Sequence, residues 1–438
     1  MIVVNGSGRA EAMAKVGEID MVDTALAGGH GDVVRQTEII ISNVLRGGVL
    51  ISVFLILAGL GSFFVHQLLG HAVATTFPDT LDGVFTQVTT GQPLAIAMLG
   101  LLVLLATPVL RVAVSIIAFY IERDDTYVAI TALVLAILLF SIFAVGYWLG
   151  QPGANLVQDA TPSFFFAVMA ASLVAGFIGA LVGLGGGVFI VPILTLVFHL
   201  PFLTAIGASI VSVIATSSGA ASAYVKDRMT NLRVGMFLEV ATTLGAICGA
   251  LLTTLLSAQV LFIVFGLVLI VSALPLLAKL GEELPRGVRT HRWARQLRLN
   301  GSYPDHRLHR EVNYRVARVP AGFGMMYVAG LISGLLGIGS GVFKVLAMDT
   351  AMRLPMKVST TTSNFMIGVT AAASAGIYFQ RGAIDPVIAA PVALGVLAGA
   401  MIGALTLTRM SNAWLRKVFV PVILLVAANM LARGLGLL

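Results

Sequence analysis

Charged side chains are scarce in this sequence: they make up 11% of its 438 residues, whereas hydrophobic residues make up 58%. The mean hydropathy is +0.98. A soluble domain needs far more charge to cover its surface, so the composition excludes an ordinary soluble protein. Several apolar runs reach the roughly 20 residues that one bilayer crossing requires. We therefore predict an all-α, multi-spanning integral membrane protein.

Residues for covalent and metal chemistry are equally sparse. The one cysteine, Cys248, lies inside an apolar run, which excludes a disulfide framework and a thiolate metal cluster. The sequence has no Gly-x-x-x-x-Gly-Lys-Ser/Thr nucleotide motif, no His-Glu-x-x-His zinc motif and no Gly-x-Ser-x-Gly serine motif. It therefore predicts a protein that is not an enzyme or an ATP-driven pump, with no cofactor and no metal site.

Positive charge is concentrated in one stretch. The net charge is +7, and basic residues are densest between Lys279 and Arg318. Binding to nucleic acid is one interpretation of such a stretch. Because cytoplasmic loops of membrane proteins carry an excess of Lys and Arg, we favour a basic cytoplasmic loop at residues 280–319. We expect no nucleic-acid partner.

The N-terminal third is predicted to be a separate unit. Residues 1–36 are polar and lack the apolar core of a signal peptide, so we expect a flexible cytoplasmic extension. Residues 37–150 are predicted to be a three-helix accessory membrane domain. Its apolar segments are expected at about 44–65, 93–110 and 127–149, with 111–120 either extending the second or lying at the membrane interface.

The rest of the chain is an internal duplication. Residues 174–189 match residues 328–343 at an offset of 154 residues (328 minus 174), and this offset continues without a gap to Gly403. Internal repeats of this size are typical of secondary transporters. We assign transporter repeat 1 to residues 160–279 and repeat 2 to residues 320–438.

Each repeat is predicted to contain about five apolar segments. The second segment has only about 11 residues, too few to cross a bilayer alone, and it follows a Gly-rich break. The first two segments are therefore expected to form a helical hairpin that returns to the side it left. The other three are expected to cross.

The basic residues fix the expected topology. With the basic loop inside, this arrangement also places Arg353 and Lys357 inside and leaves only Arg381 and Arg433 outside. The two repeats are therefore predicted to be inverted relative to each other, which permits alternating access. We expect a multi-pass protein of the cytoplasmic (inner) membrane with a cytoplasmic N-terminus.

The Gly-rich breaks form the first candidate site. They contain Gly185, Gly186 and Gly187 in repeat 1 and Gly339, Ser340 and Gly341 in repeat 2. In lipid, irregular backbone persists only where protein or a water-filled cavity satisfies it. A half-helix that starts after each break would direct free N–H groups and a positive dipole end at an anion. Alternatively, the glycines only permit close helix packing.

Hydroxyl and amide side chains form the second candidate site. They are Ser209 and Ser212 in repeat 1 and Thr362, Ser363 and Asn364 in repeat 2. Hydroxyl groups can replace water around an oxyanion without adding net charge. The alternative is that they bond to their own helix or link helices. Asn364 fits that alternative less well, because an amide at membrane depth needs partners.

Charged residues near membrane depth form the third candidate, because such charge is costly and usually functional. Lys344 follows the second Gly-rich break, where repeat 1 has Ile190, and Asp349 lies shortly after it. Lys344 is expected to supply positive charge to an anion, to pair with Asp349 or to couple transport to protons; snorkelling to the surface is the alternative. Glu239 is a further proton-coupling candidate, although we favour a structural ion pair near the basic loop.

These motifs resemble those of a known family. The run Gly183–Pro192, the Ser/Thr-rich segment after it and the Gly/Ala-rich residues 245–250 resemble the TauE/SafE family of sulfite exporter-like permeases. The second copy, at residues 337–343 and 359–368, supports this resemblance. It covers about residues 164–438.

The resemblance implies export or uptake of sulfite, sulfonates or related organic anions. Residues 44–149 look like a small uncharacterised membrane domain that some family members carry. Three residues of repeat 2 depart from their counterparts in repeat 1, namely Ser340, Lys344 and Leu346. These departures leave the exact substrate open.

The sequence as a whole predicts a secondary transporter of a small anion, with the substrate and the bilayer as partners and a homo-oligomer left open. Two alternatives remain. A cation or metal transporter would need carboxylates or histidines clustered at depth, where only Asp349 and Glu239 are available. A non-transporting sensor or scaffold would use the accessory domain or the basic loop to bind a partner or anionic lipid.

Overall fold

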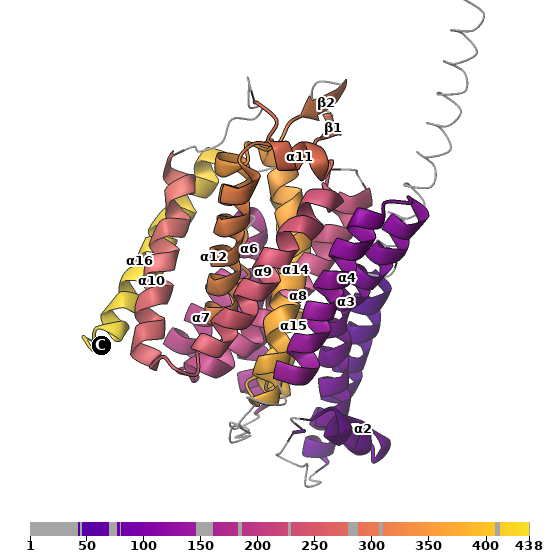
Figure 1. Ribbon diagram of the computed structural model, residues 1–438. Coiled ribbons are helices and arrows are strands. Elements are labelled where there is room, and N and C mark those ends of the chain that lie inside the picture. The colour runs from indigo at the N-terminus through magenta and orange to yellow at the C-terminus, as the bar shows by residue number, and fades with distance from the viewer. Residues whose placement is uncertain are drawn as a thin grey trace, which may run out of the picture.

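The computed structural model describes residues 43, 46–69, 77–78, 80–145, 161–182, 186–226, 229–278, 288–305, 310–407 and 412–437. Within them the chain is almost entirely helical, and seven helices are long and apolar enough to cross a membrane. Most of the helices run side by side in one bundle (Figure 1). This confirms the predicted all-α membrane class. The predicted N-terminal extension and Gly185 lie outside the described residues.

Three long helices precede the duplicated part, as predicted. They are Arg46–Leu68, α3 (Pro93–Ile121) and α4 (Asp125–Phe140), which continues into the π-helical η1 (Ser141–Val145). The short helix α2 (Leu81–Thr89) lies between the first two. α3 begins at a proline, whose fixed φ suits a first helical position. Because α3 is one helix of 29 residues, residues 111–120 extend the second apolar segment.

The helices of the duplicated part repeat with the sequence. Repeat 1 contains α6 (Pro162–Val182), α7 (Gly187–Pro192), η2 (Ile193–Val197), α8 (Phe202–Lys226), α9 (Leu232–Leu252) and α10 (Ala258–Ala278). Repeat 2 contains α12 (Val319–Leu336), α13 (Gly341–Leu346), η3 (Ala347–Ala351), α14 (Met356–Gln380), α15 (Pro386–Leu407) and α16 (Asn412–Gly434). Adding 154 to the bounds of α7, η2 and α8 gives those of α13, η3 and α14.

The two repeats pack through reciprocal helix pairs. α6 packs on α15 as its counterpart α12 packs on α9, while α8 packs on α14 and α10 on α16. Glycines bring the backbones of α9 and α12 close together, since a Cβ on Gly330 would lie 2.1 Å from the carbonyl oxygen of Thr242. Such reciprocal contacts are those that a two-fold relation between repeats produces. The inversion of the repeats across the membrane stays a prediction.

Replacing Gly334 of α12 by alanine is expected to destabilise the fold by about 1–3 kcal/mol, the usual cost of overpacking. A Cβ there would lie 1.9 Å from the carbonyl oxygen of Ala246, so α9 and α12 would have to separate. Gly324→Ala on the same helix is the matched control, because its Cβ would meet nothing within 4 Å. Thermal unfolding in detergent should show a loss only for Gly334→Ala. Equal melting temperatures would contradict the close packing.

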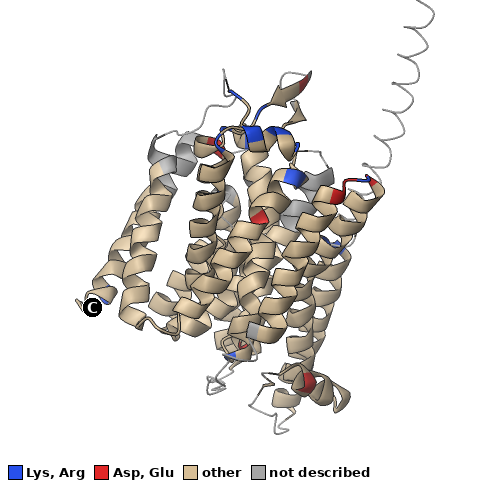
Figure 2. Cartoon of the chain, in the orientation of Figure 1, with Lys and Arg blue, Asp and Glu red and all other residues tan. Residues whose placement is uncertain are grey.

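The basic loop has a fold of its own. It contains the short helix α11 (Arg292–Gln296) and an antiparallel hairpin of β1 (Gly301–Asp305) and β2 (Arg310–Tyr314). Figure 2 shows Lys and Arg gathered at the end of the bundle that carries these elements. From the sequence we predict only a basic cytoplasmic loop here, so the hairpin is a finding of the structure.

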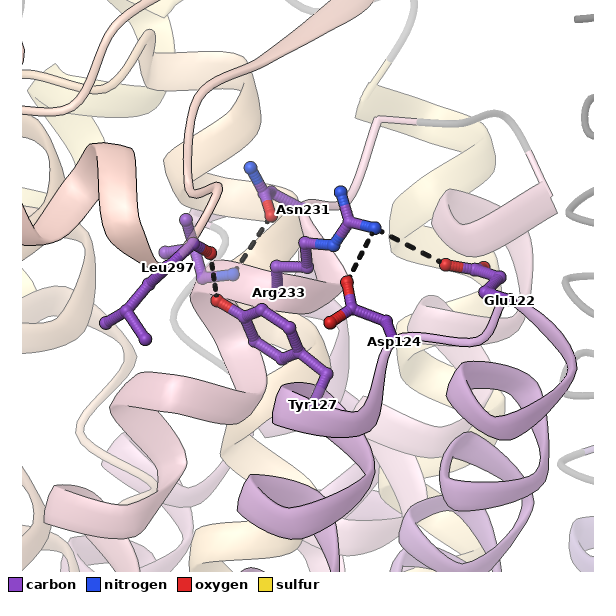
Figure 3. A network of polar contacts seen from close by, with 7 residues as sticks. Glu122, Asp124, Tyr127, Asn231, Arg233 and Leu297 are labelled. Atoms are coloured by element: carbon purple, nitrogen blue, oxygen red, sulfur yellow. Dashed lines mark hydrogen bonds and ion pairs between the residues drawn. The ribbon is translucent and has the colours of Figure 1, made fainter.

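A polar network holds this loop against the accessory helices and against repeat 1 (Figure 3). The Tyr127 hydroxyl of α4 donates to the carbonyl oxygen of Leu297, 2.7 Å away. Beside it, Arg233 of α9 forms ion pairs with Asp124 at 3.0 Å and with Glu122 at 3.6 Å. The loop, the accessory helices and repeat 1 are therefore joined at one end of the bundle.

Asn231 extends this network from the start of α9. Its side-chain oxygen caps α9 by accepting from the Val234 amide, and its amide donates to Leu299 and to the Tyr314 hydroxyl. Burial raises the pKa of Tyr314 to about 12, although the bond from Asn231 opposes this rise. The Tyr314 hydroxyl therefore stays protonated at neutral pH and can keep accepting from Asn231.

Candidate functional site

The two Gly-rich breaks lie against each other. The Ser209 hydroxyl of α8 donates to the carbonyl oxygens of Gly187, at 3.2 Å, and of Gly337, at 2.8 Å. A Cβ on Gly187 would lie only 3.2 Å from that same Gly337 oxygen. One hydroxyl thus links the break of repeat 1 to the break of repeat 2.

Repeat 2 contains the same bond at the equivalent position. The Ser363 hydroxyl donates to the carbonyl oxygen of Gly341 at 3.2 Å, as Ser209 does to Gly187. The turn before α13 is left-handed at Gly339 (φ +72°) and at Ser340 (φ +47°). Glycine adopts this conformation freely, whereas Ser340 is strained there. The Ser340 side-chain oxygen is buried without a hydrogen-bond partner in the described part of the chain.

The helices that follow the breaks are short. α7 and α13 have six residues each and start at Gly187 and Gly341. Gly186 precedes α7 in a right-handed conformation, where a Cβ would lie 2.7 Å from Val396. Close packing, the alternative interpretation of the glycines, therefore applies at Gly186.

The remaining hydroxyl candidates have structural partners. The Ser212 hydroxyl donates to the carbonyl oxygen of Ser209 in its own helix, at 2.7 Å. The Thr362 oxygen accepts from the Asn231 backbone amide at 3.1 Å, which joins α14 to the start of α9. Asn364 is half-buried on α14. Ser212 and Thr362 thus fit the structural alternative.

Lys344 lies in the interior of the bundle with an exposed fraction of 0%. Its ammonium donates to the Thr370 hydroxyl of α14, which in turn donates to Glu239 Oε1 at 2.8 Å. Snorkelling of Lys344 to the surface is therefore not what the structure shows. The nearby carboxylate reached through Thr370 belongs to Glu239, while Asp349 lies in η3.

Glu239 is also buried, with an exposed fraction of 1%. The sequence favours a structural ion pair for this residue, and its carboxylate interacts electrostatically with two buried cations, Lys344 and Arg111. Its second oxygen, Oε2, has no hydrogen-bond partner among the residues that the structure describes. The position of Glu239 is thus internal to the transporter repeats.

Arg111 is the residue that the sequence interpretation missed. It lies on α3 with an exposed fraction of 0%, and Nη1 donates to the Phe365 carbonyl oxygen of α14. Its guanidinium carbon also lies 4.9 Å from the centre of the Phe365 ring. A lone arginine inside a long apolar segment was the signal that could have revealed it.

Arg111, Glu239 and Lys344, with Thr370 as a bridge, form what we call the buried charge cluster. When all three are ionised, two cations face one carboxylate, so the cluster carries an excess of positive charge. Buried charge without a partner is costly, and an anion would compensate this excess. No group of three or more His, Cys, Asp or Glu suited to a metal ion occurs in the described ranges.

Comparison with known proteins identifies the family. Residues 168–430 match the sequence model of the family described as sulfite exporter TauE/SafE. The chain belongs to the TauE/SafE family. This match covers both repeats and confirms the resemblance found in the motifs. Residues 41–143 match a second family, described as a protein of unknown function (DUF1634).

Related proteins are named as transporters. A probable membrane transporter protein, YunE of Bacillus subtilis, is 25% identical over 62% of this chain and 98% of its own length. Another, YdhB of the same organism, is 28% identical over 53% of this chain and 84% of its own length. No solved structure matches. From the family match and these relatives, the chain is a membrane transporter and not an enzyme.

The residues of the buried charge cluster lie in two different family segments. Glu239, Lys344 and Thr370 lie inside the TauE/SafE segment, whereas Arg111 lies inside the DUF1634 segment. The cluster is thus assembled from both parts of the chain.

Proposed function

We propose that this TauE/SafE protein is a secondary transporter of a small anion. Sulfite, a sulfonate or a related organosulfur anion is the favoured substrate class, in keeping with the family description. The observation that supports this proposal is the buried charge cluster, in which Arg111 and Lys344 outnumber the single carboxylate of Glu239. A small anion is the ligand that this excess of positive charge favours.

The cluster lies on the elements that the Gly-rich breaks organise. Lys344 belongs to α13, which starts directly after the second break, and Thr370 belongs to α14, whose Ser363 bonds to Gly341. A change in the packing of the two breaks would therefore move Lys344 relative to Glu239. Alternating access between inverted repeats would use this movement to expose the anion to each side in turn.

Glu239, Lys344 and Asp349 are the groups that we propose as candidates for proton coupling. Carboxylates inside transporters commonly serve as proton relays, and a buried lysine can also titrate. The basic end of the bundle in Figure 2 would face the cytoplasm under the positive-inside rule, with the protein in the cytoplasmic membrane.

Flux in proteoliposomes that contain the purified full chain tests this function. Sulfite, sulfate, thiosulfate, taurine and sulfoacetate would each be offered in both directions, with and without a proton gradient. The expected result is saturable flux of at least one sulfur oxyanion above that of protein-free liposomes. Absence of flux for every anion under all of these conditions would reject the proposal and favour a cation transporter or a sensor.

A further inference from the structure

The accessory helices reach the transporter repeats along α3, α4 and η1. The Thr107 hydroxyl of α3 lies 3.1 Å from the Ser218 hydroxyl of α8, within hydrogen-bonding distance. The Ser141 hydroxyl of η1 donates to the Ala373 carbonyl oxygen of α14. Arg111 lies one turn further along α3 than Thr107, so its guanidinium belongs to this contact between the two parts of the chain.

The Arg111 guanidinium uses only part of its hydrogen-bonding capacity. Nη1 donates to Phe365, whereas Nε and Nη2 have no hydrogen-bond partner among the described residues. These two nitrogens present parallel N–H groups on one edge of the planar group. That edge is the one that binds two oxygens of a carboxylate or another oxyanion. A fully buried pair of donors without an acceptor is costly, so binding an oxyanion at this edge would be favourable.

The surroundings of this edge suit an oxyanion. A Cβ on Gly368 of α14 would lie 3.2 Å from Arg111 Nη2 and 2.3 Å from the Ser217 hydroxyl oxygen. Because residue 368 is glycine, no side chain separates these two polar groups. Arg111 also interacts electrostatically with Glu239, which links it to Lys344 and Thr370. The Arg111 guanidinium is thus part of the buried charge cluster.

We infer that the Nε and Nη2 edge of Arg111 binds two oxygens of the transported anion, so that the DUF1634 segment completes the transport site. This inference rests on the proposed anion transport and narrows its substrate class. An anion that presents two oxygens at once, such as sulfite or a sulfonate, satisfies both donors. A halide satisfies them less well, because it is a single acceptor.

The test compares three variants in proteoliposomes, with the panel anion that the wild type moves fastest. Arg111→Gln removes the charge, whereas Arg111→Lys keeps the charge and removes the paired donors. Thr107→Val is the matched control. Thr107 lies on α3, as Arg111 does, and its replacement removes the hydroxyl contact with Ser218 of α8. We expect the KM to rise on the order of 100-fold for Arg111→Gln and about tenfold for Arg111→Lys. We expect it to stay unchanged for Thr107→Val.

A second readout is the rise in melting temperature that the anion causes in detergent, which we expect both Arg111 variants to lose. If Arg111→Gln does not fold, the comparison of Arg111→Lys with the wild type provides the test. A KM and an anion-dependent stabilisation that stay at the wild-type values in the Arg111 variants would overturn this inference and leave anion transport standing. A wild type that neither moves nor binds any anion of the panel would overturn both.

Discussion

Replacing Lys344 by isoleucine is expected to reduce anion flux about 100- to 1,000-fold. Isoleucine is the residue at the equivalent position of repeat 1, Ile190, so the helix can accommodate its shape. Truncating one partner of a buried charge pair in a binding site costs about 2–5 kcal/mol, and a loss of about 3–4 kcal/mol corresponds to this range at about 1.36 kcal/mol per tenfold change. Without the ammonium, Arg111 and Glu239 balance each other, and the excess positive charge that would attract the anion is gone.

The flux of Lys344→Ile would be compared with that of Arg353→Gln. Arg353 is an exposed cation in the same repeat, outside the buried charge cluster, so its replacement should leave flux near the wild-type rate. Both variants would be purified by size exclusion, and flux would be normalised to folded protein. Wild-type flux in Lys344→Ile would show that the anion crosses without this ammonium and would contradict the proposed site.

Replacing Glu239 by glutamine is expected to uncouple transport from the proton gradient. Glutamine keeps the shape of the side chain and an oxygen that can accept from Thr370, but it does not titrate. Coupling free energies of 1–3 kcal/mol correspond to effects of about 5- to 150-fold. We therefore expect an imposed proton gradient to accelerate net flux by such a factor in the wild type and not in Glu239→Gln. Exchange of anion for anion should continue in the variant.

Asp349→Asn is the control for this second prediction. Asp349 belongs to η3 and is the other carboxylate that we named as a proton-coupling candidate. Because Asp349 lies outside the buried charge cluster, we expect its replacement to change the response to the proton gradient less than Glu239→Gln does. A gradient response that disappears in Asp349→Asn and persists in Glu239→Gln would assign the coupling to Asp349. A response that persists in both would leave neither carboxylate as the coupling group.

The sequence predicted the repeated helices well because their signals are local. The Gly-rich breaks interrupt the helix at the same place in each repeat, and the short helices that follow begin at Gly187 and Gly341. Glycine is unfavourable inside a helix, and the left-handed turn at Gly339 needs it. The close packing of α9 on α12 depends on small residues that the sequence also displays.

Partners distant in the sequence could not be predicted in this way. The sequence leaves open whether residues 111–120 extend the apolar segment before them, because the charge of Arg111 interrupts the hydropathy run, whereas α3 continues through it. Glu239 meets Thr370 only after the two repeats pack together. The hairpin of the basic loop depends on tertiary contacts such as that of Asn231 with Tyr314, and short polar strands carry little signal of their own.

The most direct test of whether transport uses the buried charge cluster is to locate a bound anion in a crystal structure. Selenite, the selenium analogue of sulfite, can be identified by its anomalous scattering in crystals of the full chain. We predict a selenium peak beside Lys344 and the free edge of Arg111, close enough for the selenite oxygens to accept hydrogen bonds from both, and loss of this peak in Lys344→Ile. A peak elsewhere in the bundle that survives in Lys344→Ile would contradict it.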